Sequence, residues 1–232
     1  MKHPVLLLLI CFGPFTKAFC QDSNAPVDFG YKNIWVTVKT KDKKKLADAL
    51  GLRNQKASGW ANGVNQAYKD KVFITPAVGQ WTMALGWGLL CPGLKGSEDE
   101  LRCYKDIINR LSLIFGEAEL FVTHRVSEYH FWAKSVNGKI VRLYFYVGES
   151  GENIDVEGAP TAVEQKLHLV NTLSPEAIRD PNYTDRTDLT FPDEDVVMKV
   201  AGYWSVNPSR LTERKDVAVG MGLLGDGNPV TR

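Results

Sequence analysis

Alternating apolar runs lie on both sides of one turn within the stretch from Gly116 to Gly148. This stretch is the richest in strand-forming residues, and it contains the dipeptide Asn137-Gly138. That dipeptide accepts the positive φ angles that a two-residue hairpin turn requires. The pattern therefore predicts a β-hairpin that turns at Asn137-Gly138. We expect it to be central in a sheet or covered on one face, because both of its faces are rich in aromatic residues.

A two-residue turn also fixes which residues face each other across the hairpin. It places Trp132 opposite Leu143, and Phe131 opposite Tyr144. One face then presents large aromatic side chains and an arginine, residue types that dominate protein recognition. We expect a binding surface made of Tyr129, Phe131, Arg142, Tyr144 and Tyr146. The alternative is that a helix of the chain covers this face and makes it core.

The remaining pattern alternates between strand and helix periods. Strand-like runs lie at Asn33–Thr40, Lys71–Thr75 and Gln80–Leu85, and helical spacing at Lys41–Leu50, Leu101–Phe115 and about 195–204. Capping boxes at Ser97 with Glu100 and at Thr161 with Glu164 begin two helices. Residues 57–68 are expected to be a weak strand or loop, and 148–158 an acidic loop.

These elements predict an α+β fold, in which a mostly antiparallel sheet packs against helices. The expected domain covers residues 31–214, after a loose leader at 21–30 and before a flexible, Gly-rich tail at 215–232. A helix followed by a strand meander occurs twice in this order. Two similar halves are therefore an alternative interpretation of the same pattern.

The N-terminus has the pattern of a signal peptide at residues 1–20. Lys2 and His3 precede the apolar run from Pro4 to Phe15, and Ala18-Phe19-Cys20 resembles a cleavage site. The run is too short to span a bilayer, so no transmembrane anchor is expected. Cleavage after Cys20 is favoured over lipidation at Cys20. The protein is therefore expected to be exported, to the periplasm or the exterior of the cell.

Composition and charge exclude some partners. The 232 residues are 44% hydrophobic and 24% charged, with a net charge of +1, and removal of residues 1–20 lowers it to −1. A near-neutral chain gives no electrostatic case for nucleic acid or for an anionic membrane. The lysine cluster within Lys41–Leu50 is interpreted as a solvated helix face.

Two cysteines remain after removal of the signal peptide, and export would oxidise them. Cys91 and Cys103 lie twelve positions apart, with Pro-Gly and Gly-Ser breaks between them. A bridge that closes so short a loop stabilises a fold by roughly 3 kcal/mol. A disulfide between Cys91 and Cys103 is predicted in preference to two buried thiols. Neither a metal nor another cofactor is predicted.

Histidine chemistry supplies the enzymatic alternative. His124, Glu128 and His130 would share a face if one unbroken strand carried them, and could then bind a metal or support hydrolysis together with a serine or carboxylate. His130 also has aromatic neighbours, as expected for a core histidine. The segment 220–225 has the glycine spacing of a dinucleotide loop, but no helix can follow it, so the match is interpreted as accidental.

Three segments resemble a family of exported bacterial proteins of unknown function. They are GEAELFVTHRVSEYHFWAKSVNGKIVRLYFYVGESGE, GAPTAVE and DEDVVMKVAGYWSVNPSRL, and the resemblance covers about residues 72–211. It implies no catalytic or binding residue, although such proteins include immunity-like interaction modules. The sequence thus predicts a non-catalytic module that binds another protein. The alternative is a small hydrolase or metal-dependent enzyme around His124, Glu128 and His130.

Overall fold

The computed structural model describes residues 24–91 and 96–227. The expected signal peptide, its cleavage site and the alternative of lipidation at Cys20 lie outside these residues. Within the described residues no helix is long and apolar enough to cross a membrane.

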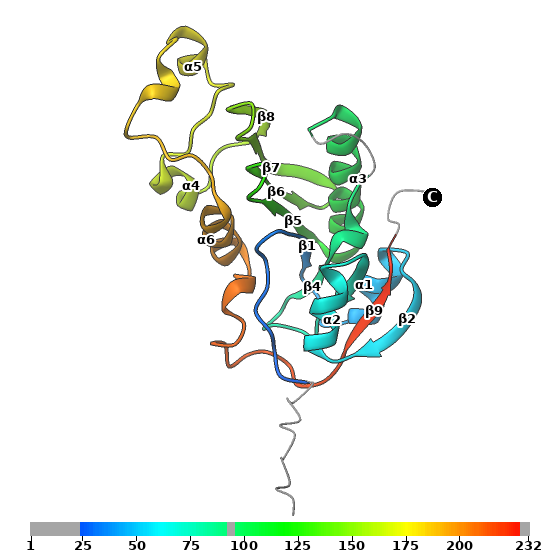
Figure 1. Cartoon of the computed structure of the whole chain (residues 1–232). Helices are drawn as coiled ribbons and strands as arrows, with labels where there is room; N and C mark the ends of the chain where they lie inside the picture. The colour runs from blue at the N-terminus through cyan, green and yellow to red at the C-terminus, as the bar shows by residue number, and fades with distance from the viewer. Residues whose placement is uncertain (1–23, 92–95, 228–232) are drawn as a thin grey trace, which may run out of the picture.

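A single antiparallel sheet runs through the described part of the chain (Figure 1). Its strand order is β2-β9-β3-β4-β1-β5-β6-β7-β8. The strands are β1 (Asn33–Val38), β2 (Arg53–Ser58), β3 (Lys71–Ile74), β4 (Thr82–Leu85), β5 (Glu117–His124), β6 (Tyr129–Val136), β7 (Lys139–Val147), β8 (Glu152–Glu157) and β9 (Gly222–Asp226). The predicted α+β class with an antiparallel sheet is confirmed.

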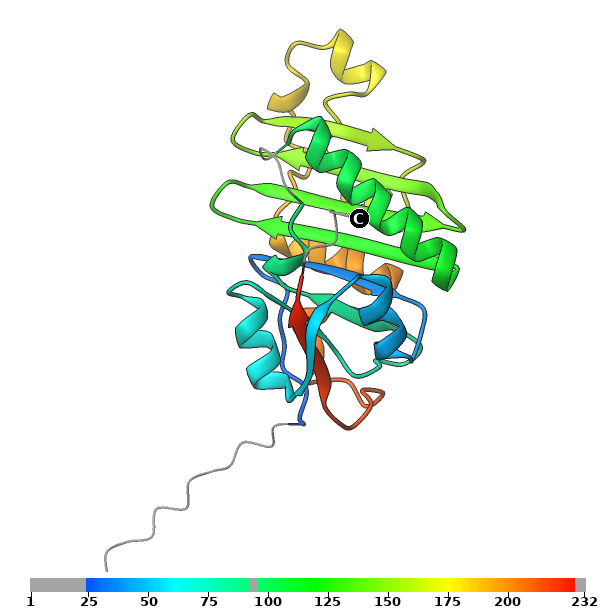
Figure 2. The same ribbon diagram turned by 90° about the vertical axis from the view of Figure 1, so that its right-hand side faces the viewer.

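Helices cover both faces of this sheet (Figure 2). The α-helices are α1 (Lys43–Ala49), α2 (Trp60–Ala67), α3 (Glu98–Phe115), α4 (Ala162–Leu167), α5 (Pro175–Arg179) and α6 (Glu194–Trp204). Single 3₁₀ turns are η1 (Trp87–Leu89), η2 (Tyr183–Asp185) and η3 (Pro208–Arg210). The longest described helix, α3, is capped by Ser97, whose hydroxyl accepts from the backbone N–H of Glu100 as the capping box predicts. The reciprocal bond differs, since the Glu100 carboxylate accepts from the N–H of Gly96 and not from that of Ser97.

Each face of the sheet has its own apolar layer. Side chains of α1 and α3 pack with one face, where Phe131 and Phe145 lie. Side chains of α2 and α6 pack with the other, where Trp35, Trp132 and Tyr144 lie. The strands therefore carry apolar residues on both faces, which explains the aromatic density that the sequence shows in the hairpin.

The predicted hairpin forms, but its register is wrong beyond the first pairs. Ser135 faces Ile140 as expected, and the register then shifts by one residue, so that Trp132 faces Tyr144. The extra residue is Val141, a β-bulge in β7. A shift of one residue exchanges the two faces of a strand. The hairpin lies between β5 and β8, inside the sheet.

The C-terminal stretch that was expected to be a flexible tail contributes a strand. β9 inserts between β2 and β3, and Leu224 is buried. Its glycines permit close packing: a Cβ on Gly222 would lie 2.3 Å from the carbonyl oxygen of Ile74. These glycines therefore reflect a crowded strand rather than loose chain.

Three other elements differ from the sequence prediction. Residues 57–68 form the end of β2 and then α2, where Gly63 is required because a Cβ would lie 2.2 Å from the ring of Phe73. Residues 148–158 contain the edge strand β8. The leader is not loose where it is described, since Phe29 is buried and its N–H donates to the carbonyl of Pro208.

The element order does not confirm two similar halves. The first part runs strand, helix, strand, helix and hairpin, whereas the second begins with α3 and continues as a four-stranded meander. In addition, β9 from the end of the chain completes the sheet beside the first part.

Replacement of Leu224 by alanine tests whether β9 belongs to the core. We expect Leu224→Ala to lower the free energy of unfolding by about 2–4 kcal/mol, because a buried leucine is truncated. Val219→Ala, in the same stretch but 94% exposed, should change it by less than ~0.5 kcal/mol. Urea denaturation measures both. Equal, negligible effects would mean that the stretch is the flexible tail the sequence suggested.

Candidate functional site

The predicted aromatic binding surface does not exist as one face. The bulge in β7 places Tyr129 and Phe131 on the face covered by α3, whereas Arg142, Tyr144 and Tyr146 lie on the opposite face. All five side chains are buried by the chain's own elements. The prediction of an exposed surface at these residues is therefore wrong, and the alternative that helices cover them is correct.

The two histidines of the enzymatic alternative, His124 and His130, do not lie together. His124 ends β5 and faces Tyr129 across the hairpin, whereas His130 faces Thr123, the residue before His124. Because successive residues of a strand point to opposite faces, the two imidazoles lie on opposite faces of the sheet. Glu128 lies in the intervening turn at φ +44°, with its side chain against Gly148. The condition under which these three residues would share a face, one unbroken strand, is therefore not met, because β5 ends at His124 and β6 begins at Tyr129.

The described residues also contain no group of three or more histidine, cysteine or carboxylate side chains that could hold a metal ion. The local partners of the two histidines are hydroxyls: His130 Nδ1 lies 3.0 Å from Thr123 Oγ1, and His124 Nδ1 lies 3.1 Å from Ser127 Oγ. The second pair lies within one β-turn, where it links the two ends of the turn.

A pocket lies where the ends of β5 and β6 meet α3 and η1. Its volume is about 280 Å³, and four separate segments line it: Trp87, Leu90 and Cys91 from η1 and after it, Glu100 from α3, Val122 and His124 from β5, and Tyr129 from β6. Most of this lining is apolar. A pocket of this volume accommodates a group of the size of an indole, since a cavity of about 150 Å³ holds benzene.

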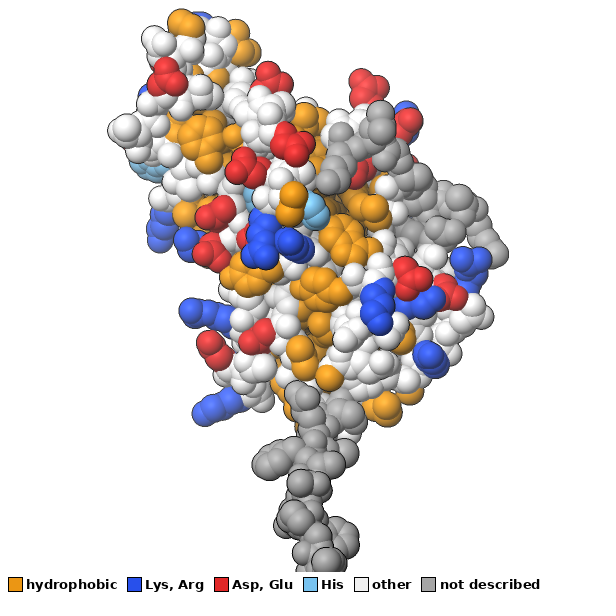
Figure 3. All heavy atoms as spheres, in the orientation of Figure 1, with side chains coloured by type: hydrophobic (Ala, Val, Ile, Leu, Met, Phe, Trp, Pro, Cys, Tyr) orange, Lys and Arg blue, Asp and Glu red, His pale blue; other side chains and the backbone are white. Residues whose placement is uncertain are grey.

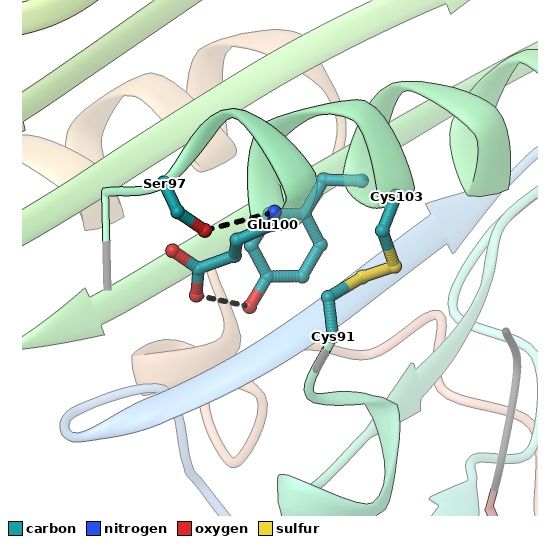
Figure 4. Close-up of a disulfide and its surroundings, with 5 residues drawn as sticks. Cys91, Ser97, Glu100 and Cys103 are labelled. Atoms are coloured by element: carbon teal, nitrogen blue, oxygen red, sulfur yellow. Dashed lines mark hydrogen bonds between the residues drawn. A yellow bond between two sulfur atoms is a disulfide. The ribbon is translucent and has the colours of Figure 1, made fainter. Parts of the chain in front are cut away.

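The disulfide fixes one wall of the pocket (Figure 4). Cys91 is bonded to Cys103 on α3, with 6.0 Å between the Cα atoms, so the predicted pairing is confirmed. One turn earlier on α3, Glu100 points back across the helix start, where its carboxylate accepts from the N–H of Gly96 at 2.8 Å and from Tyr104 Oη at 3.3 Å. The lining at η1 is thereby tied to the start of α3.

Two buried phenol hydroxyls, that of Tyr129 in the pocket lining and that of Tyr104 beside it, are held in the neutral form. Burial raises the pKa of Tyr129 well above its ordinary value, and the neighbouring Tyr104 and Glu100 raise it further. Burial likewise raises the pKa of Tyr104, together with the charge of Glu100. A phenol in such surroundings donates or accepts hydrogen bonds but does not serve as a base at neutral pH.

The mouth of the pocket carries exposed apolar side chains. Leu90 is 47% exposed, and the ring of Trp87 lies 6.1 Å from the imidazole of His124, edge to face. Val126, two residues after His124, is 68% exposed. Figure 3 shows hydrophobic side chains gathered around a histidine on the face between α6 and α3.

The opposite face of the sheet holds buried charges that act structurally. The carboxylate of Glu164 on α4 accepts from Arg142 Nε and from Trp132 Nε1, both at 2.8 Å. Nearby, burial raises the pKa of Glu119 to about 7, although Lys134 lies 3.0 Å away and lowers it. Glu119 is fully buried, whereas Arg142 and Glu164 also line a hollow of about 200 Å³ beside α4. The hydrogen bonds of Glu164 join α4 to the sheet.

No protein-family model, curated protein or solved structure matches this chain. The resemblance to an exported bacterial family therefore stays a prediction. The candidate site is therefore assigned from the geometry of the described residues alone.

Sequence reasoning identified His124, Tyr129 and Cys91 individually but did not bring them together. It missed Trp87, Leu90 and Val122, and it treated Glu100 only as a helix cap. The one local signal was the tryptophan of Gly86-Trp87-Gly88, a large aromatic residue between two glycines and shortly before a disulfide cysteine.

The buried histidine makes the stability of the protein depend on pH. Burial lowers the pKa of His130 from 6.5 to about 4, His124 lowers it further, and Asp193 opposes the shift. The folded state therefore binds fewer protons than the unfolded state between these two pKa values. The contribution of His130 to the free energy of unfolding is complete above pH 6.5 and is lost as the pH falls toward 4. Relative to His130→Gln, the wild type should lose about 2–3 kcal/mol over this interval.

Urea denaturation of both proteins across this interval measures the difference. The comparison must be with the variant, because Glu119 contributes a slope of opposite sign: its raised pKa disfavours the folded state as pH rises toward about 7. Parallel stability curves for wild type and His130→Gln would show that His130 is not buried in its neutral form.

Proposed function

We propose that the protein is an exported, non-catalytic binding module that takes an apolar group of its partner into the pocket between Trp87 and Tyr129. The observation that carries the proposal is the lining itself: an apolar pocket of about 280 Å³ that draws on η1, α3, β5 and β6 and is braced by a disulfide. Rigid, largely apolar pockets with few polar groups are typical of ligand sites.

The polar groups are arranged to orient a bound group rather than to react with it. Glu100 is engaged with Gly96 and Tyr104, and Tyr129 is held neutral. His124 stands at the mouth, against the ring of Trp87. A guest would therefore meet aromatic and aliphatic surface first, with hydrogen-bonding groups at the end of the pocket.

A protein partner fits better than a free metabolite. Leu90, which lines the pocket, is half-exposed, and Val126 is exposed two residues after the lining residue His124, so apolar surface continues outside the pocket along this segment. Binding sites between proteins often combine one buried anchor side chain with a surrounding contact area that excludes water. We therefore assign an aromatic or branched aliphatic anchor side chain of another protein to the pocket. This agrees with the immunity-like role that the sequence resemblance suggested.

The enzymatic alternative retains one observation in its favour, the 3.1 Å approach of His124 Nδ1 to Ser127 Oγ. An imidazole beside a hydroxyl is the arrangement of a nucleophile and its base. Ser127 is buried, however, and the pair lies within a single turn. Labelling by a fluorophosphonate probe that disappears in Ser127→Ala would favour a hydrolase. The binding proposal expects no labelling.

Filling the pocket tests the proposal with indole as a model of the anchor side chain. We expect saturable binding of indole to the wild type with a Kd of about 1 mM or tighter, followed by NMR shifts of the indole N–H of Trp87, which lines the pocket and is present in every variant. Val122→Phe adds a ring inside the pocket and should weaken binding by more than about 10-fold, at a cost of roughly 1–3 kcal/mol in stability.

The matched control is Val126→Phe, which adds the same ring to an exposed position outside the pocket and should bind indole like the wild type. Leu90→Asp, at a half-exposed position, places a charge at the mouth and should weaken binding several-fold without loss of the fold. Indole binding that is unchanged in both Val122→Phe and Leu90→Asp would place the site elsewhere.

A further inference from the structure

A second surface combines concentrated positive charge with exposed aliphatic side chains. The loop after β1 and the start of α1 meet the segment before β9 around an open hollow of about 730 Å³. We call this surface the lysine corner. Its members are Thr40, Lys41, Asp42, Lys43, Lys44, Pro76, Ala77, Ala218 and Val219.

The charge at this corner is unlike that of the whole chain. Residues 39–45, KTKDKKK, carry five lysines and one aspartate, while the net charge of the complete sequence is +1. Two of the five lysines, Lys39 and Lys45, lie over the rings of Trp81 and Phe115. The other three line the hollow. Whole-chain charge balance therefore hides a local excess of about four positive charges.

The acidic groups near the corner leave most of this excess in place. Lys44 forms an exposed ion pair with Asp48, one turn further along α1. Asp42 caps α1 by accepting from the N–H of Lys45. Asp216 is paired with Arg214. Exposed ion pairs are weak, so an anionic surface can compete for these lysines.

Backbone contacts fix the apolar part of the lysine corner at the protein surface. The N–H of Ala218 donates to the carbonyl of Ala77 at 2.7 Å, and Val217 bridges to Val78 in the β3–β4 turn. Lys43 Nζ donates to the carbonyl of Met221. With its backbone fixed on both sides, the segment presents Val219 with 94% of its surface exposed, and Met221 is 42% exposed.

We propose that the lysine corner docks on the anionic headgroups of a lipid bilayer, with Val219 and Met221 entering the interfacial region. Each lysine near an anionic bilayer contributes electrostatic attraction, and aliphatic side chains beside them gain from leaving water. An isolated exposed valine needs no explanation. A valine fixed beside three lysines matches the bilayer interface better than it matches a soluble polyanion, because a polyanion offers it no apolar contact. This surface is separate from the pocket of the proposed function.

The test is cosedimentation of the purified protein with two kinds of vesicle at low ionic strength. One kind is pure phosphatidylcholine, and the other contains about one third phosphatidylglycerol. We expect at least about 10-fold tighter binding to the anionic vesicles, and loss of the difference at about 0.5 M salt. Replacement of Lys41, Lys43 and Lys44 together by glutamine should weaken binding by about 10- to 100-fold.

Two further variants make the result specific. The control removes the same charge elsewhere, by replacing the exposed Lys139, Lys166 and Lys199 with glutamine, and should bind like the wild type. Val219→Ser should weaken vesicle binding about 3-fold or more while it leaves binding to heparin unchanged.

Three outcomes would overturn the proposal. The first is equal binding to the two kinds of vesicle. The second is an equal loss in both triple variants, which would show only a dependence on net charge. The third is a Val219→Ser variant that binds vesicles like the wild type, together with displacement of the vesicles by heparin. That result would assign the lysine corner to a soluble polyanion.

Discussion

One extra residue in β7 determines which face of the sheet each aromatic side chain of the hairpin occupies. Val141 makes a bulge, and beyond it Trp132 stacks on Tyr144 with 4.3 Å between ring centroids, while Phe131 meets Phe145 on the other face. Without the bulge, Phe131 and Tyr144 would share a face. The aromatic residues of the hairpin are instead divided between two faces, and each face has its own helical cover. The hairpin is therefore core, and the surfaces available for binding lie at the ends and corners of the sheet.

The two faces are packed in different ways. The face under α3 is mostly apolar but includes the buried hydroxyls of Ser112 and Ser135, which hydrogen-bond each other, and the disulfide joins α3 to the residues just after η1. The face under α4 and α6 includes the buried pair of Arg142 and Glu164, which share 2.8 Å contacts. A buried ion pair contributes little net stability, because desolvation offsets the attraction. We infer that this pair fixes where α4 lies on the sheet, through Trp132 as a shared partner.

Local signals in the sequence were sufficient for local structure. Asn137-Gly138 marked the turn, Ser97 marked the start of α3, and the spacing of Cys91 and Cys103 indicated their bond. The errors occur where a distant segment decides the outcome. Nothing near Leu224 shows that β9 will insert between β2 and β3, and the glycines beside it resemble loose chain until Ile74 and Phe73 are placed against them. A bulge leaves no local signal either, and this single residue moved Arg142, Tyr144 and Tyr146 to the face opposite Phe131.

The candidate site could not be predicted from the sequence for the same reason. Trp87, Glu100, Val122 and Tyr129 come from four elements, and only tertiary packing brings them to one pocket. The net charge was equally uninformative, because a near-neutral total does not show that lysines gather around Val219. The location of the proposed pocket depends on one claim, that the hairpin aromatics are buried on two faces and leave binding to the periphery of the sheet.

The most direct measurement of this claim is the set of aromatic NOEs of Tyr144 in solution. The register with the bulge predicts strong cross-peaks between the rings of Tyr144 and Trp132, and cross-peaks between Phe131 and Phe145. Strong cross-peaks between Tyr144 and Phe131, with none to Trp132, would place these residues on one face and contradict the account.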